Sequence, residues 1–233
     1  MPRSLRKAPG GIVFHVLNRG VGRRGVFEKD EDYAAFERVM AHALDAVPVR
    51  LVAYCLMPNH WHLLLWPTKD GQLARFMQRL TMTHTRRWQE HYHQVGLGHL
   101  YQGRFKSFPV QQDSHFLIVA RYIERNALRA NLVARAEQWR WSSLWRHLHP
   151  GDDADRAPLP LVSWPVPRPR DWLAWINRPQ TNAELEALRL AVTKGRPFGD
   201  STWQRTMTQT LGLESAYRSP GRPKKKPVNK NRT

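Results

Sequence analysis

The chain has 233 residues, and its 37 Lys and Arg against 19 Asp and Glu give a net charge of +18 and a sequence pI of about 11.0. This excess indicates a polyanionic partner, with nucleic acid as the first candidate. No run of about 18 apolar residues is present that could span a bilayer, and the basic N-terminus lacks the apolar stretch of a signal peptide. A single cysteine, Cys55, excludes an intramolecular disulfide. We therefore expect a cytoplasmic, nucleoid-associated protein that does not bind membranes.

Six elements in the first half of the chain follow from apolar periodicity. They are a strand over 12–17, a helix over 30–47, strands over 49–57 and 60–66 around a Pro58-Asn59 turn, a helix over 71–92 and a strand over 104–110. The order strand, helix, strand, strand, helix, strand is that of the ferredoxin-like split βαβ fold. The predicted class is therefore α+β, an antiparallel sheet with helices on one face.

The second half predicts a C-terminal helical extension. A third helix runs from Ser114 to about Asn126 or Arg129, and three tryptophans mark a short helix over 139–145. A proline-rich connection follows over 150–170, with short helices over 171–176, 183–193 and 201–211. The basic end has no apolar residues to bury, so we expect it to be disordered. The predicted organisation is one domain over 10–150, connection and helices over 151–213, and a basic tail over 214–233.

The segment His60-Trp61-His62 places two imidazoles two residues apart on a predicted strand. Residues i and i+2 of a strand point to the same face, so the two side chains lie side by side. Imidazole is the commonest protein ligand for metals, and the pair could share one divalent ion. A pair of hydrogen-bonded histidines at a strand end is the alternative, and the spacing by itself does not exclude it.

Tyr122 and Asn126 lie four residues apart, so they share one face of the third helix. If that face looks at the two histidines, Asn126 could offer its carbonyl oxygen as a third metal ligand, with Tyr122 beside it as a nucleophile. A phenol with a pKa near 10 needs help at neutral pH. Bound Mg²⁺ or Mn²⁺ would provide some by polarising a phosphate. The alternative for Tyr122 is a half-buried aromatic residue on an amphipathic helix.

Taken together, these motifs resemble the single-tyrosine transposases of the HUH endonuclease superfamily, and most closely their REP-associated branch. Five segments carry the resemblance: 14–20, 58–62, 103–107, 121–133, and 195–200 with Trp203. It therefore extends from about residue 10 to about residue 225.

The resemblance implies a role for each matching residue. His60, His62 and Asn126 match the metal ligands, and Tyr122 matches a nucleophile that attacks single-stranded DNA. The attack leaves a 5′-phosphotyrosine and a free 3′-hydroxyl, and rejoining needs no ATP. The branch acts on REP sequences, which are short palindromes that fold as hairpins. This chain has Ala127 where proline is common and Asn131 where glycine is common, which affects the helix geometry rather than the chemistry.

Basic residues cluster near these segments and suit phosphate contacts. The predicted DNA-binding set is Arg19, Arg104, Lys106, Arg121, Arg125, Arg129 and Arg222. For any one of them, solvated surface charge is the alternative. Arg222 resembles a hook that reads a minor groove, and a nonspecific electrostatic tail is its alternative.

Three functions remain open from the sequence. The first is a metal-dependent, single-strand-specific DNA endonuclease and strand transferase that acts through Tyr122. The second is a module that binds structured DNA or RNA on the same fold without cutting it. The third is hydrolysis by a metal-activated water, which would leave no phosphotyrosine. The extra C-terminal helices favour a monomer with its site in cis, although related enzymes form dimers that share the tyrosine in trans.

Overall fold

A computed structural model describes residues 7–151 and 157–218 of the chain. Its centre is an antiparallel sheet of four strands, in the spatial order β2-β3-β1-β4. The strands are β1 (Val13–Arg19), β2 (Arg50–Met57), β3 (His60–Trp66) and β4 (Lys106–Val110). This order is that of the ferredoxin-like fold, so the predicted α+β class and the predicted hairpin around Pro58-Asn59 are confirmed.

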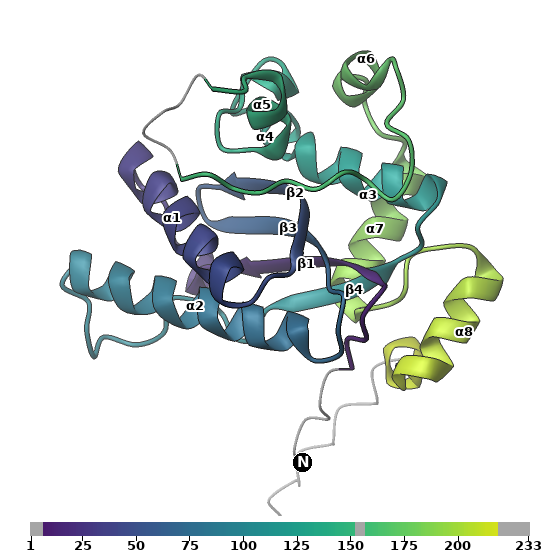
Figure 1. The fold of residues 1–233 in the computed structure, drawn as a ribbon, viewed down its shortest axis with the longest axis horizontal. Helices are drawn as coiled ribbons and strands as arrows, with labels where there is room; N and C mark the ends of the chain where they lie inside the picture. Colours follow the sequence, from purple (N-terminus) through teal and green to yellow (C-terminus); the bar gives the residue numbers. More distant parts are fainter. Residues whose placement is uncertain (1–6, 152–156, 219–233) are drawn as a thin grey trace, which may run out of the picture.

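The two helices of the split βαβ unit pack on one face of the sheet (Figure 1). They are α1 (Asp30–Ala46) and α2 (Gln72–His91), within two residues of the predicted ends. Every second strand residue points toward them, so Trp61 and Leu63 of β3 join Phe36 of α1 and Phe76 of α2 in a buried apolar core. The short 3-10 helix η1 (Val21–Arg23) follows β1.

The opposite face of the sheet is covered by the third helix. It consists of α3 (Ser114–Glu124) and α4 (Asn126–Arg129), joined through Arg125. Apolar residues of this face pack against Phe116 and Val119 of α3. The sheet is therefore enclosed on both faces, with the third helix on the side away from α1 and α2 (Figure 1).

The C-terminal extension is helical, as predicted. Its elements are η2 (Ala136–Gln138), α5 (Ser143–Leu148), α6 (Trp172–Asn177), α7 (Asn182–Lys194), α8 (Ser201–Leu211) and η3 (Glu214–Tyr217). The short helix predicted over 139–145 is wrong in its bounds, because Trp139 and Trp141 lie in the connection between η2 and α5, and Trp145 lies in α5. No helix within the described residues is long and apolar enough to cross a membrane.

The extension also covers both edges of the sheet. At the β2 edge, the Leu56 N–H donates to the carbonyl of Trp141, and the Val162 N–H donates to the carbonyl of Leu51, each at 2.9 Å. At the β4 edge, Phe198 pairs with Val110 in a parallel bridge. Open edges can template aggregation, so the extension completes the sheet as well as lengthening the chain.

The structure describes the first residues of the predicted tail over 214–233. Glu214–Tyr217 forms η3, which is held because the Arg196 guanidinium donates to the Ala216 carbonyl at 3.0 Å and lies over the Tyr217 ring. Residues 219–233, which include Arg222, lie outside the described part of the chain.

Candidate active site

The two histidines of β3 lie on the face of the sheet that looks toward α3. Their ring centroids are 5.0 Å apart, and His62 is buried whereas His60 is half-buried. The register of β1 on β3 sets Arg19 opposite His60 and Leu17 opposite His62. The predicted pair of side-by-side imidazoles is therefore present, next to a cationic side chain.

A third histidine, His15 of β1, joins this pair. Its Nε2 atom lies 2.8 Å from Nδ1 of His62, and its side chain is fully buried. Sequence reasoning gave His15 no role of its own. The available signal was a histidine at a core-facing position of an apolar strand, where a polar side chain needs a partner.

Asn59, at the hairpin turn, orients His60. Its Nδ2 atom donates to the Arg23 carbonyl at 3.2 Å, which identifies the amide orientation. Its Oδ1 atom lies 2.6 Å from Nδ1 of His60 and must accept, so His60 carries its proton on Nδ1. The Nε2 lone pair of His60 is therefore left for a ligand.

All three imidazoles are held neutral at pH 7. Burial lowers the pKa of both His15 and His60 to about 3, and nearby arginine charge contributes to both shifts. Burial, followed by the charges of its neighbours, lowers the pKa of His62 well below the usual range. A neutral imidazole keeps one lone pair, which is the form that binds a metal.

Tyr122, in the last turn of α3, reaches the histidine cluster within the same chain. Its ring meets the His62 ring edge to face at 5.8 Å and the His15 ring at 6.1 Å. The guanidinium of Arg129 lies 4.0 Å from the centre of the Tyr122 ring. The helix face that carries Tyr122 therefore does look at the histidines.

Asn126 begins α4, one turn after Tyr122, and is buried. Its Oδ1 atom accepts a hydrogen bond from Arg129 at 2.9 Å, while its Nδ2 atom has no partner among the described residues. The next residue, Ala127, directs its N–H at the thiol of Cys55, and Cys55 lies directly opposite His62 in the sheet. Asn126 therefore lies at the start of α4, above the part of the sheet that contains the candidate metal ligand His62.

These side chains fit a divalent cation by the chemistry of their donors. Two neutral imidazole nitrogens and an amide oxygen form a partial ligand set with open coordination positions, as a metal that also binds a phosphate requires. The oxygen of Asn126 has a second lone pair beside the one that Arg129 uses. The described residues contain no group of three or more His, Cys, Asp or Glu arranged to hold a metal.

Two of the predicted DNA-binding arginines are corrected by the structure. Arg121 is buried, and its Nη2 atom donates to the carbonyls of Arg178 and Pro179 at 2.6 and 3.1 Å. Arg125 is half-buried, and its Nη1 atom donates to the carbonyls of Ile176 and Asn177, both at 3.0 Å. The carbonyls of Ile176 and Asn177 end α6, where they lack helical partners and the helix dipole is negative, and those of Arg178 and Pro179 follow directly. Both guanidiniums therefore anchor α6 to the tyrosine helix.

The other described cations of the predicted set remain available to a phosphate. Arg129 Nη1 and Arg19 Nε are buried and have no hydrogen-bond partner among the described residues. Lys106 is exposed at the start of β4, on the same sheet face as His15. Arg104 is exposed and lines a groove of about 790 Å³ between α2 and the loop before β4.

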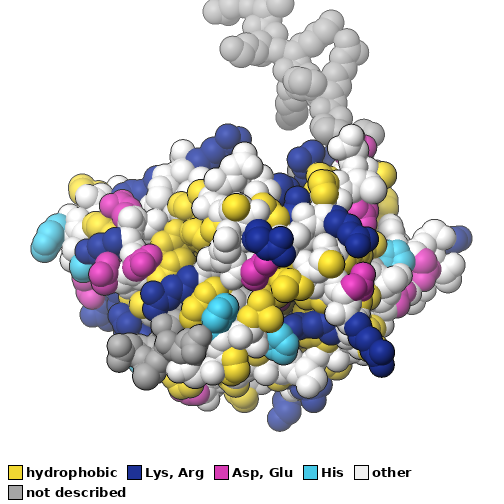
Figure 2. Space-filling view, turned by 90° about the horizontal axis from the view of Figure 1, so that it is seen from above, with side chains coloured by type: hydrophobic (Ala, Val, Ile, Leu, Met, Phe, Trp, Pro, Cys, Tyr) yellow, Lys and Arg dark blue, Asp and Glu magenta, His cyan; other side chains and the backbone are white. Residues whose placement is uncertain are grey.

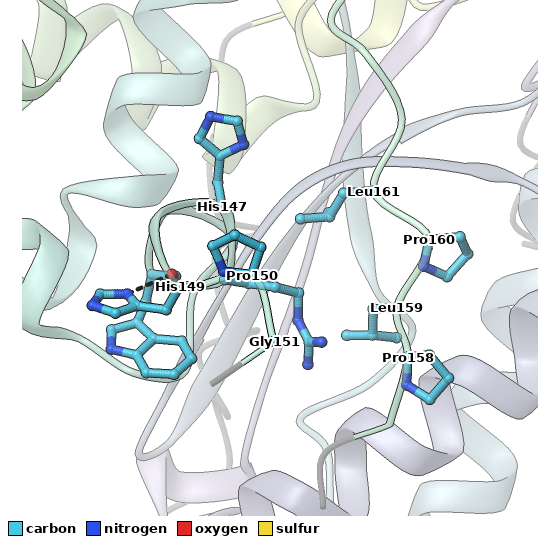
Figure 3. Close-up of a pocket in the computed structure, with 10 residues that line it drawn as sticks. His147, His149, Pro150, Gly151, Pro158, Leu159, Pro160 and Leu161 are labelled. Atoms are coloured by element: carbon cyan, nitrogen blue, oxygen red, sulfur yellow. Dashed lines mark hydrogen bonds between the residues drawn. The ribbon is translucent and has the colours of Figure 1, made fainter. Parts of the chain in front are cut away.

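Two further regions of the described chain differ from this cluster. Figure 2 shows Lys and Arg interspersed with acidic and hydrophobic side chains, without one continuous basic patch on that face. A cavity of about 440 Å³ lies between the end of α5 and residues 158–161, and Figure 3 shows His147 and His149 at its wall. It contains no member of the histidine cluster, and His149 is hydrogen-bonded to the Trp145 carbonyl.

The two departures from the expected helix motif are accommodated. Asn131 has a φ of +57°, the left-handed region in which glycine is favoured and asparagine is tolerated better than most residues. Ala127 lies in the first turn of α4, where proline is also compatible with a helix.

Residues 10–126 match the family described as "Transposase IS200 like". This range contains His15, His60, His62, Tyr122 and Asn126. The chain belongs to this family. Transposases cleave and rejoin DNA, so the chain is an enzyme of DNA transposition. Members of the family generally depend on a metal ion.

Two solved structures are similar to this family member. One is a REP-associated tyrosine transposase bound to a REP hairpin, 16% identical over 70% of this chain and 94% of that chain, with a TM-score of 0.47. The other is a protein described as a transposase from Deinococcus radiodurans, 23% identical over 53% of this chain and 96% of that chain, with a TM-score of 0.38. No curated protein matches the chain.

Proposed function

We propose that this chain is a divalent-metal-dependent endonuclease and strand transferase that acts on single-stranded DNA at REP-type hairpins, with Tyr122 as its nucleophile. The observation that carries this proposal is the packing of Tyr122 against the neutral His15 and His62 imidazoles of its own chain.

His60, His62 and Asn126 would hold the metal, which supplies Lewis-acid polarisation of the scissile phosphate when bound. The Tyr122 hydroxyl oxygen attacks phosphorus, and its proton passes to water. The bond from phosphorus to the 3′ oxygen breaks, and that oxygen takes up a proton as a free 3′-hydroxyl. The 5′-phosphotyrosine keeps the ester bond, so a 3′-hydroxyl can reverse the step without another energy source.

Arg129 and Arg19 support the charge that develops on the phosphate. Both guanidiniums have a buried nitrogen without a partner among the described residues, and Arg129 lies over the Tyr122 ring. Guanidinium donors bind phosphate oxygens strongly, because the bond is charge-assisted. Arg104 and Lys106 would contact the DNA backbone farther from the nucleophile.

A covalent adduct assay tests the nucleophile. A REP-type hairpin oligonucleotide with a single-stranded flank, incubated with Mg²⁺ or Mn²⁺, should shift the protein on a denaturing gel. Tyr122→Phe should abolish the shift, whereas the matched control Tyr217→Phe, in the exposed η3 turn, should retain it. An adduct that persists in Tyr122→Phe contradicts the proposal. Cleaved DNA without an adduct would indicate hydrolysis by water, and tight binding without cleavage would indicate a binding module.

We also propose that the chain acts as a monomer with its site in cis. The support is that Tyr122 contacts histidines of its own chain and that Arg121 and Arg125 tie its helix to α6. Mixing Tyr122→Phe with His62→Gln should not restore adduct formation. Restored activity would show a tyrosine shared between two chains.

A further inference from the structure

His15 is a buried side chain of the cluster to which the proposed chemistry assigns no role. Its ring plane lies within 12° of the His62 plane, with the centroids 5.0 Å apart. That separation is near the largest that a 2.8 Å contact between His15 Nε2 and His62 Nδ1 allows. The two nitrogens therefore lie almost on the line between the ring centres, as in a hydrogen bond in the ring plane.

The direction of this hydrogen bond decides whether His62 can bind a metal. A neutral imidazole has one protonated nitrogen and one lone pair. If His62 donates from Nδ1, its Nε2 lone pair is free for a cation. If His15 donates from Nε2, the proton of His62 lies on its Nε2 and blocks that position. His60 has no such ambiguity, because an amide oxygen of Asn59 accepts from it.

We propose that His15 is a positioning residue whose Nε2 atom accepts a hydrogen bond from the Nδ1–H of His62, so that the Nε2 lone pair of His62 is free for the metal. This inference rests on the metal-dependent function proposed above. The second nitrogen of His15, Nδ1, is buried without a partner among the described residues, beside the rings of Phe108 and Tyr122.

That unpartnered nitrogen makes the hydrogen bond responsive to the metal. The two directions of the bond leave His15 Nδ1 either as an unpaired donor or as an unpaired acceptor, and burial penalises both. Without a metal, the two directions of the His15–His62 hydrogen bond should therefore be similar in free energy. A cation at Nε2 of His62 is compatible with only one, so metal binding and the tautomer of His15 are coupled.

The test measures Mn²⁺ binding by the full chain without DNA, by calorimetry. His15→Leu removes the acceptor and should weaken Mn²⁺ affinity by about 10- to 100-fold. His15→Gln can place an amide oxygen near the Nε2 position and should recover most of that loss. Thermal unfolding in EDTA checks that each variant is folded. Wild-type affinity in a folded His15→Leu variant overturns the inference, as does a wild-type protein that binds no Mn²⁺.

A second measurement uses the unaltered protein, so it does not depend on how a variant folds. Nitrogen-15 spectra of the imidazoles with saturating Mg²⁺ should show the His62 proton on Nδ1, and a proton on Nε2 would overturn the inference. The adduct assay separates the two proposals. Affinity that depends on His15 without a Tyr122 adduct would refute only the proposed function. A Tyr122 adduct with no effect of His15 on affinity would refute only this inference.

Discussion

Histidines are buried on both faces of the central sheet, but their hydrogen bonding differs. On the face that α1 and α2 cover, a hydrogen bond of 2.6 Å joins Nδ1 of His84 to the Tyr101 hydroxyl. The indole N–H of Trp61 donates to the same hydroxyl. On the face toward α3, His15 is bonded to another histidine and leaves a buried nitrogen without a partner among the described residues. Burial lowers the pKa of both to about 3. The hydrogen-bonded network of His84 thus stabilises the face under α1 and α2. The unpaired nitrogen of His15 on the face toward α3 suits a site that binds a ligand.

Strand β3 contributes to both faces through alternate residues. Trp61 and Leu63 enter the apolar core under α1 and α2, whereas His60 and His62 face the tyrosine helix. Substitutions one residue apart should therefore affect either chemistry or stability, but not both equally.

The largest effect is expected for His62→Gln. Loss of a metal ligand removes several kcal/mol of transition-state stabilisation, so the rate of adduct formation should fall by about 1,000-fold or more. The free energy of unfolding should change much less than the rate, because the Gln amide can still offer a hydrogen bond to His15, the buried partner of His62. Single-turnover kinetics and urea unfolding measure the two quantities. A stable variant with wild-type kinetics would remove His62 from the site.

The neighbouring substitution Leu63→Ala should show the opposite pattern. Leu63 is fully buried on the helix face, so truncation leaves a cavity and should cost about 2–5 kcal/mol of unfolding free energy. Adduct formation per folded molecule should stay near the wild-type rate at low temperature. A large kinetic loss in the folded fraction would show that the two faces are coupled.

His84, on the sheet face that α1 and α2 cover, should make the stability of the protein depend on pH. The folded pKa of His84 is about 3, below its ordinary value of 6.5, so the unfolded chain binds a proton that the folded chain does not. Stability due to this group is complete above pH 6.5 and is lost as the pH falls toward 3. His84→Asn should lower the slope of unfolding free energy against pH by up to about 1.4 kcal/mol per unit.

Urea unfolding between pH 4 and 6.5 measures that slope. His15, His60 and His62, whose pKa values are also lowered, are present in both proteins, so the difference between the two slopes isolates His84. Equal slopes would mean that His84 is protonated to the same extent in the folded and unfolded states.

The smallest effects compare two cations. Arg121→Met should cost about 1–3 kcal/mol of stability, because it leaves the carbonyls of Arg178 and Pro179 without their donor. Arg104→Met should leave stability unchanged. It should instead reduce the log–log salt slope of hairpin binding by about 0.9, as expected for one lost phosphate contact. Unfolding curves and salt titrations distinguish the two variants. A lower salt slope for Arg121→Met and a loss of stability for Arg104→Met would contradict the roles given to both arginines.

The sequence by itself determined the features that depend on local periodicity. Alternation along a strand places His60 and His62 on one face, and the helical repeat places Tyr122 and Asn126 one turn apart. The order of elements identifies the ferredoxin-like sheet, and the charge indicates nucleic acid. Each of these follows from residues close together in the chain, where backbone geometry leaves few alternatives.

Only the tertiary structure decided which distant residues meet. The bond from His15 to His62 joins positions 47 apart in the chain, and the bond from Arg121 to the end of α6 joins positions 57 apart. Strand register and helix docking set both contacts, and neither leaves a local pattern. Arg121 and Arg125 look like DNA contacts in the sequence, because the sequence does not show whether an arginine near the motif is exposed or buried. They are structural because unpaired carbonyls at a helix end lie within their reach.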